Sequence, residues 1–308
     1  MVTKINCNLP NFFLVGAAKS GTTSLYNYLK QHPEIFMPSL KEPKYISSFA
    51  KTFPHTGPGD IYADRRMVMK WDDYKDIYQD ALNEKAIGDA SIDNLYYYHV
   101  AIPNIRKICA KPKILIILRN PVDRAFSAYS HMVKLNREKF SFETGIKKEK
   151  ERKEQNYEFI WHYTGLGFYY KQVKAYIDEF GSDSVKILLY ENLKNDSLDT
   201  IQKLYNFLEV DENFTPDITR KYNISKIPKS GRFQNLISKD NLLKRILRPF
   251  FLSIIGFNNT ENLVNYIEKI NIKTINPLTR RNLTELFRED IINLQELIDR
   301  DLSDWINY

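Results

Sequence analysis

Short runs of apolar residues alternate along the chain with longer segments in which apolar residues recur every three or four positions. The continuous runs predict buried β-strands, and the recurring pattern predicts amphipathic helices. The run at Lys113–Leu118 (KILIIL) is rich in β-branched residues, which suits a strand buried on both faces near the centre of a sheet. The predicted strands are Asn11–Ala17, Ile35–Pro38, Ala86–Ala90, Lys113–Leu118 and Val185–Tyr190.

Helices are predicted in the segments between these strands. They cover about 22–31, 102–110, 121–136, 167–180, 198–208 and 280–297. Pro121 suits the first turn of a helix, and Gly181 suits the end of one. The strongly charged stretch 141–156 is expected to be an exposed helix or excursion.

Strands that alternate with helices predict the fold class. The expectation is an α/β fold, with a P-loop-type central parallel β-sheet flanked by helices on both faces. Nothing in the pattern demands a domain boundary, so we expect a single domain over residues 1–308.

Composition is that of a folded globular protein, with 43% apolar and 27% charged residues. No apolar run is long enough to span a bilayer, and the polar segment 1–10 lacks the apolar core of a signal peptide. These features predict a cytoplasmic protein. Neither Cys7 nor Cys109 has histidine or cysteine neighbours at metal-ligand spacing, so no metal site is expected.

Positive charge is concentrated in one segment. The formal net charge is +7, and residues 220–248 contain nine Lys or Arg against one acid, Asp240. Such a segment favours an anionic partner: a nucleotide, a sulfated or phosphorylated substrate, or a membrane surface. A solvated helix face is the alternative for any single residue of the run. We expect no nucleic-acid partner.

A glycine-containing turn, Gly16-Ala-Ala-Lys-Ser-Gly-Thr-Thr-Ser24, stands between the first predicted strand and the first helix. A turn in that place directs backbone N–H groups at one point, and the helix N-terminus adds a positive dipole end. The sequence therefore predicts a phosphate-binding loop, with hydroxyl donors at Thr22 and Thr23.

This loop departs from the ATP-binding pattern G-x-x-x-x-G-K-[ST]. Thr22 stands where that pattern has its lysine, and Lys19 comes two residues before Gly21. The strand that could supply a metal-binding aspartate ends instead in Arg119. Both departures argue against Mg·ATP chemistry and for a nucleotide with two separate phosphate groups. A P-loop-like nucleotide kinase remains the alternative enzyme.

The loop resembles the 5′-phosphosulfate loop of sulfotransferases that use 3′-phosphoadenosine 5′-phosphosulfate (PAPS). Leu118–Ser127 (LRNPVDRAFS) resembles their 3′-phosphate motif, in the same order and about a hundred residues later. The similarity extends along nearly the whole chain, toward bacterial sulfotransferases and the sulfotransferase domains that modify heparan-type glycans. It implies PAPS as donor, PAP as product and no required metal. The implied nucleotide contacts are Lys19, Ser20, Gly21, Thr22, Thr23, Ser24, Arg119 and Ser127.

The segment Lys41-Glu-Pro-Lys-Tyr45 resembles the K-E-x-x-[FY] segment of this branch. The resemblance makes Glu42 the catalytic base, which takes a proton from the acceptor as sulfur is attacked. It places Lys19 near the bridging oxygen of the leaving phosphate, with Lys41 as a second cation. His131 resembles a histidine near the acceptor in the glycan branch, and a helix-surface histidine is its alternative.

Residues 223–232 resemble a late basic loop that closes over the nucleotide, which implies contacts from Lys229, Ser230 and Arg232. The commoner forms carry an arginine or a lysine–glycine pair at the site of Lys229, so the individual contact stays open. Tyr169 matches an aromatic position near the adenosine or acceptor pocket, and a core tyrosine is its alternative.

The resemblance implies sulfuryl transfer to a hydroxyl or amine of an acceptor: a glycan, a glycolipid or a small molecule. A non-enzymatic alternative is peripheral membrane contact through residues 241–257, where basic and apolar residues interleave as in interfacial helices. Pro249 interrupts that segment, which favours a lid or packing helix. The sequence predicts no oligomeric state.

Overall fold

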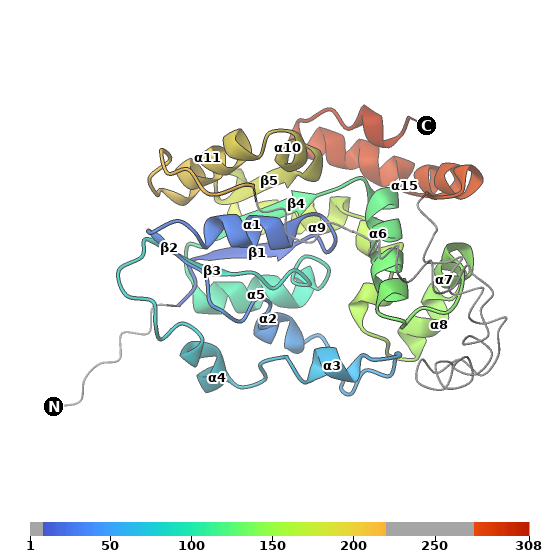
Figure 1. Ribbon diagram of the computed structural model, residues 1–308, viewed down its shortest axis with the longest axis horizontal. Coiled ribbons are helices and arrows are strands. Elements are labelled where there is room, and N and C mark those ends of the chain that lie inside the picture. Colours follow the sequence, from blue (N-terminus) through green and yellow to red (C-terminus); the bar gives the residue numbers. More distant parts are fainter. Residues whose placement is uncertain (1–8, 220–273, 308) are drawn as a thin grey trace, which may run out of the picture.

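Five parallel strands form one sheet in the order β2-β3-β1-β4-β5 (Figure 1). The computed structural model describes residues 9–219 and 274–307. The strands are β1 (Phe12–Gly16), β2 (Ile35–Phe36), β3 (Ala86–Asp89), β4 (Lys113–Leu118) and β5 (Val185–Leu189). All five predicted strands are present, and β4 is an interior strand that pairs with both β1 and β5.

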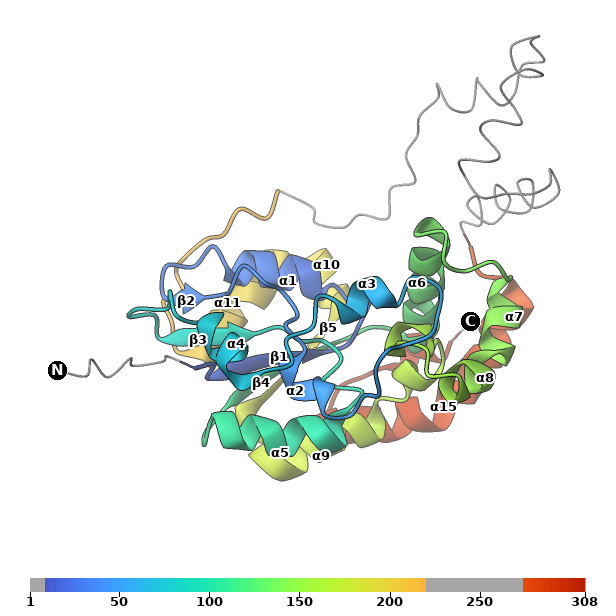
Figure 2. The same cartoon turned by 90° about the horizontal axis from the view of Figure 1, so that it is seen from below.

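Helices cover both faces of this sheet, as predicted (Figure 2). Successive side chains of β1 explain why: Phe12 and Leu14 enter one apolar core, whereas Phe13 and Val15 enter the other. The helices that contribute to the first core are α1 (Thr22–Leu29), α10 (Tyr190–Asn195) and α11 (Ser197–Leu208). Those that contribute to the second include α5 (Tyr98–Ile108) and α9 (Tyr170–Phe180).

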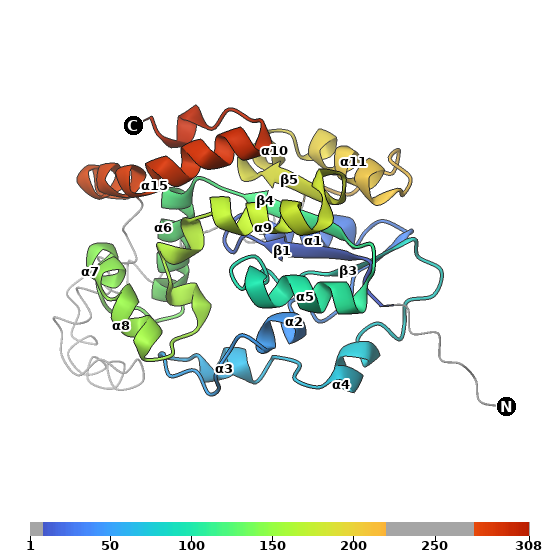
Figure 3. The same cartoon turned by 180° about the vertical axis from the view of Figure 1, so that it is seen from behind.

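The second core continues beyond the sheet, where α6 (Pro121–Lys134) and α15 (Pro277–Ile298) pack together (Figure 3). Phe287 of α15 is fully buried there. The Asp290 carboxylate of α15 accepts hydrogen bonds from the backbone N–H groups of Tyr169 (2.7 Å) and Tyr170 (3.2 Å). Tyr169 is the N-cap residue and Tyr170 the first residue of α9, so a residue distant in sequence caps that helix.

Three short helices between β2 and β3 have no counterpart in the predicted pattern. They are α2 (Tyr45–Ser48), α3 (Ile61–Asp64) and α4 (Trp71–Asp76). Each is too short to show a helical repeat of apolar residues. Asp60, at the start of α3, fixes this region: its carboxylate accepts from the Glu158 N–H (2.9 Å) and the Trp161 indole N–H (3.0 Å), and it pairs with Arg137.

The helix predicted over 102–110 is α5, which begins earlier, at Tyr98. The structure corrects two further expectations from the sequence. The 141–156 stretch forms two helices, α7 (Phe142–Lys147) and α8 (Glu149–Glu154), and two of its charged side chains are buried. Glu149 accepts from the N–H groups of Thr164 and Gly165, and Arg152 pairs with Glu138 at 2.8 Å. Because Thr164, Gly165 and Glu138 all lie outside the stretch, its high charge alone could not predict that two of its side chains are buried.

The second correction concerns where α9 begins. It starts at Tyr170 and not at Gly167, because Gly165–Gly167 forms a 3₁₀ helix. A Cβ on Gly167 would lie 2.9 Å from the Phe287 ring, so only glycine allows this close packing.

Some of the sequence predictions fall outside the described residues. They concern the basic segment 220–248, the segment 241–257, and Lys229, Ser230 and Arg232. Within the described ranges, no helix is long and apolar enough to cross a membrane.

Candidate functional site

Two loops meet at the carboxyl ends of the neighbouring strands β1 and β4. From β1 the chain builds β2 and β3 on one side, and then crosses to build β4 and β5 on the other. Ligands of open parallel sheets bind at such a reversal of strand order. Here the loops open into a cleft of about 1550 Å³ that is lined from both sides of the reversal.

The first loop ends at Gly21, which precedes α1 in the left-handed conformation (φ 91°). A Cβ at this position would lie 2.8 Å from the Tyr190 ring, so the close approach also requires glycine. The N-cap residue Gly21 has no side chain that could cap α1, and the first residues of the helix, Thr22 and Thr23, line the cleft. A helix N-terminus at a cleft wall favours a bound anion.

Lys19 extends from this loop into the cleft, where most of the charged groups that act on it are positive. Burial in the cleft and the nearby cations Lys134, Lys41 and Arg119 together lower the pKa of Lys19 to about 8, against the opposing effect of Glu42. An ammonium group surrounded in this way is stabilised by a bound anion.

Arg119, at the end of β4, joins the two predicted motifs. Its Nη1 donates to the backbone carbonyl of Lys19 (3.3 Å), and its guanidinium lies over the Tyr190 ring at 4.8 Å. The Tyr169 hydroxyl donates to the Arg119 carbonyl (3.0 Å). Tyr169 is fully buried and so is a core tyrosine that supports Arg119 from behind.

The second loop leads into α6, which forms a long wall of the cleft. The Asn120 side chain caps the helix by accepting from the Val122 N–H (2.9 Å), and Pro121 occupies the first turn. Ser127 and His131 follow at helical spacing and both line the cleft. Enclosure in the cleft, together with the positive charges of Lys19, Arg137 and Lys134, lowers the pKa of His131 to about 4. The imidazole is therefore neutral near pH 7.

Glu42 also lines the cleft, and Lys41 links it to Thr23 in the first turn of α1. The Lys41 ammonium donates both to Thr23 Oγ1 (3.0 Å) and to Glu42 Oε1 (2.8 Å). The Lys44 ammonium lies 3.9 Å from Glu42 Oε2. The Glu42 side chain is 24% exposed, so its carboxylate remains open to the cleft.

Nearly all predicted site residues within the described ranges line this one cleft. They are Lys19, Gly21, Thr22, Thr23, Ser24, Lys41, Glu42, Arg119, Ser127 and His131. Ser20 is the exception, since its side chain is fully buried and its N–H donates to the Ala17 carbonyl.

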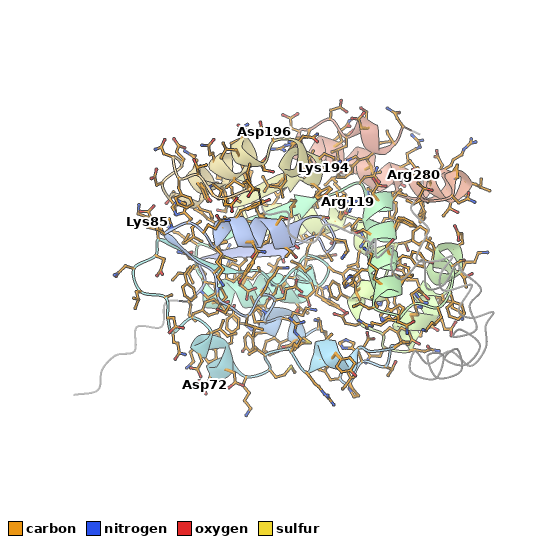
Figure 4. The ribbon with its side chains drawn as sticks, viewed as in Figure 1. Asp72, Lys85, Arg119, Lys194, Asp196 and Arg280 are labelled. Atoms are coloured by element: carbon orange, nitrogen blue, oxygen red, sulfur yellow. The ribbon has the colours of Figure 1, made fainter. Side chains whose placement is uncertain are left out.

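Further charged residues of the cleft were missed by the sequence reasoning. They are Lys44, Arg66, Asp123, Lys134, Arg137, Glu158, Lys194 and Arg280. Figure 4 shows three of the basic residues, Arg119, Lys194 and Arg280, which come from segments far apart in the sequence. Lys134 could have been found, because it follows Ser127 and His131 on the same face of α6. The lining contains nine Lys or Arg against three acidic residues.

Within the described parts of the chain, no three His, Cys, Asp or Glu side chains are grouped so that they could hold a metal ion.

The sequence profile of the sulfotransferase domain matches residues 9–248. A sulfotransferase structure from Alicyclobacillus acidocaldarius has 34% sequence identity and a TM-score of 0.77, and the alignment covers 97% of this chain and 99% of that one.

Two curated relatives match over shorter stretches. The membrane-associated sulfotransferase kil1 of Dictyostelium discoideum is 32% identical over 152 residues, which is 47% of this chain and 29% of that protein. The human bifunctional heparan sulfate N-deacetylase/N-sulfotransferase 3 is 34% identical over 125 residues, 40% of this chain and 13% of that protein. The matched part is thus less than a third of either relative. The match over residues 9–248 and the full-length structural likeness show that the chain belongs to the sulfotransferase domain family.

Proposed function

We propose that this protein transfers the sulfuryl group of PAPS to a hydroxyl or amine of a carbohydrate or glycolipid acceptor. One observation carries the proposal: Lys19, Glu42 and Arg119, from three separate motifs, line the same cleft at the strand-order reversal. Membership of the sulfotransferase domain family supports it.

The proposed donor carries phosphate groups at two separate positions, and the cleft offers cationic or helix N-terminal groups for each. The N-terminus of α1 and Lys19 would hold the 5′-phosphosulfate, and Arg119 and Ser127 would hold the 3′-phosphate. The surplus of basic lining residues suits a ligand with several negative charges. When bound, PAPS supplies an activated sulfuryl group and a phosphate leaving group.

Each side chain then has a defined role in the transfer. The Lys19 ammonium stabilises negative charge on the departing bridging oxygen, where a preorganised cation contributes most. The Glu42 carboxylate takes the proton of the acceptor hydroxyl or amine. Lys41 fixes Glu42 Oε1 relative to the phosphate loop through its second hydrogen bond, to Thr23. Neutral His131 is available for a hydrogen bond to the acceptor.

The acceptor class is inferred from relatives. The human protein that matches here is named for heparan sulfate, a carbohydrate. Labelled PAPS, incubated with the enzyme and a panel of polysaccharides and lipid-linked glycans, tests this directly. Label in the small-molecule fraction alone would contradict a glycan acceptor.

A nucleotide kinase is the competing function, and calorimetry separates the two. We expect PAP to bind more tightly than ATP with Mg²⁺, because Arg119 stands where a kinase places a metal-binding acid. Tighter binding of Mg·ATP would overturn the proposal.

Replacing Glu42 tests the base. Glu42→Gln should lower turnover by about 10²- to 10⁴-fold, while PAP affinity changes little. Glu154→Gln is the matched control, since that side chain is 66% exposed on α8. Full turnover in Glu42→Gln would remove Glu42 from the mechanism.

A further inference from the structure

Glu42 has a second cationic neighbour, Lys44, whose ammonium also pairs with Glu158, another lining residue of the cleft. We infer that the Lys44–Glu158 pair is a positioning device: it holds Glu42 Oε2 in place by charge while leaving that oxygen free to accept a proton. The inference rests on the proposed function, in which Glu42 is the base.

The backbone brings these side chains together. Glu42 and Lys44 both adopt the left-handed conformation, with φ 62° and 56°, on either side of Pro43. Such conformations are unfavourable for residues other than glycine, so surrounding contacts must maintain them. One such contact is the Lys44 N–H, which donates to Ser91 Oγ at 2.9 Å.

The Lys44 ammonium lies closer to the Glu158 carboxylate than to the Glu42 carboxylate. Nζ is 3.0 Å from Glu158 Oε1, within hydrogen-bond range, and 3.9 Å from Glu42 Oε2, beyond it. Lys41 already donates to the other oxygen, Glu42 Oε1, at 2.8 Å. Oε2 is therefore the less engaged oxygen of Glu42, attracted by Lys44 but not bonded to it.

Glu158 is a firm anchor for this arrangement. Its side chain is only 6% exposed, and its N–H donates to the buried Asp60 carboxylate at 2.9 Å. Asp60 also binds Trp161 and Arg137, so the anchor is part of a packed network. A rigid anchor is what allows Lys44 to hold a fixed distance from Glu42.

Lys44 remains charged in this environment. Burial alone would lower the pKa of Lys44, but the carboxylates of Glu158, Asp93 and Glu42 raise it above its usual value. Asp93 itself is paired with Lys51 and accepts from Ser47 Oγ at 2.7 Å.

Other charged groups face the same carboxylates. Glu42 also faces Lys41 and Lys19, and Glu158 also faces His131. These groups stay in place in every variant below, so they do not account for differences between the variants.

Two substitutions should displace Glu42 in opposite directions. Lys44→Met removes an attracting cation, so the carboxyl should titrate at higher pH than in the parent protein. Glu158→Gln removes a like charge and releases the ammonium toward Oε2, so the carboxyl should titrate at lower pH. A purely structural role for either residue predicts no such opposition.

The titration can be followed without knowing the acceptor. Protein labelled with ¹³C at the glutamate carboxyl carbon is titrated by NMR, and the Glu42 resonance is the one missing from Glu42→Gln. Lys150→Met is the control, since Lys150 is 90% exposed and should leave the Glu42 titration unchanged.

Kinetics of sulfate transfer from labelled PAPS form the second arm. Lys44→Met and Glu158→Gln should each lower kcat by about tenfold or more, while PAP affinity stays within about twofold of the parent, as expected when positioning alone is lost. Lys44→Arg should restore part of kcat, because it retains the cation. If Lys44→Met fails to fold, the double variant Lys44→Met/Glu158→Gln removes both charges, and its Glu42 titration should fall between those of the single variants.

Titration shifts in the same direction, or no shift in either variant, would overturn the inference. Failure of the proposed function would look different: Glu42→Gln would keep full turnover even though the opposite NMR shifts were present.

Discussion

The Lys41 ammonium is hydrogen-bonded to Thr23 Oγ1 at 3.0 Å, although the two residues are 18 positions apart in the sequence. Thr23 belongs to the first turn of α1, and Lys41 immediately precedes Glu42. The proposed base and the phosphate loop are therefore parts of one hydrogen-bonded unit. The first predictions concern the cations of this unit and its surroundings.

Lys19→Met should lower sulfate transfer by about 10²- to 10³-fold, the usual loss when one stabilising group of a transition state is removed. The fold should persist, because the substitution relieves repulsion among Lys19, Lys134 and Arg119. Turnover and thermal unfolding measure the two effects. Lys203→Met serves as control, because the Lys203 side chain on α11 is 66% exposed. Retained turnover would exclude Lys19 from the chemistry.

PAP affinity should depend on pH through Lys19. In the free protein the pKa of Lys19 is lowered to about 8, and a bound anion raises it again. The ligand thus prefers the protonated form, so affinity should be constant below this pKa and fall as pH rises through about 8.

Calorimetry in two buffers of different ionisation enthalpy should show proton uptake on PAP binding above that pH. The Lys19→Met variant should lose this pH dependence. An unchanged profile in that variant would assign the proton to another group.

Arg119→Gln should weaken PAP binding by roughly 10- to 100-fold, because a charge-assisted contact to the 3′-phosphate is lost. AMP lacks that phosphate, so its affinity should change much less. Ser127→Ala should show the same selectivity with a smaller loss. Competition binding with both nucleotides checks this, and equal losses for PAP and AMP would place the 3′-phosphate elsewhere.

Gly21→Ala should destabilise the protein and abolish PAP binding. Its left-handed φ of 91° costs a non-glycine residue about 1–2 kcal/mol, and the new Cβ would lie 2.8 Å from the Tyr190 ring. Gly181→Ala is a matched control, since Gly181 also has positive φ (81°) but nothing within 4 Å of its added Cβ. That control should lose stability while keeping PAP affinity, as denaturant unfolding and calorimetry would show.

Sequence reasoning located the sheet and the two motif loops that meet at the cleft because their signals are local. A buried strand is a continuous apolar run, and Gly21, Arg119 and Pro121 stand at fixed offsets from strand ends. Lys19 and Glu42 were found through resemblance to a family, and their shared cleft became visible only in the structure.

The missed residues act through contacts that are distant in sequence. Glu158 reaches Lys44 across 114 positions, and Asp60 reaches Trp161 across 101. No periodic pattern encodes such pairs. Ser20 differs from the other motif residues, since the structure buries its side chain, and its predicted nucleotide contact stays a prediction.

The capping of α9 by Asp290 bears on how the protein should be produced. The sulfotransferase profile ends at residue 248, whereas α15 begins at Pro277. An expression fragment cut at the end of the profile would lack Phe287, Ile291 and Leu294, each buried against the second core and each contributing about 1.5–3 kcal/mol. It would also lack Asp290 and Arg280, and so both the cap of α9 and one cation of the cleft wall. A cloning boundary taken from family similarity would yield an insoluble or inactive product.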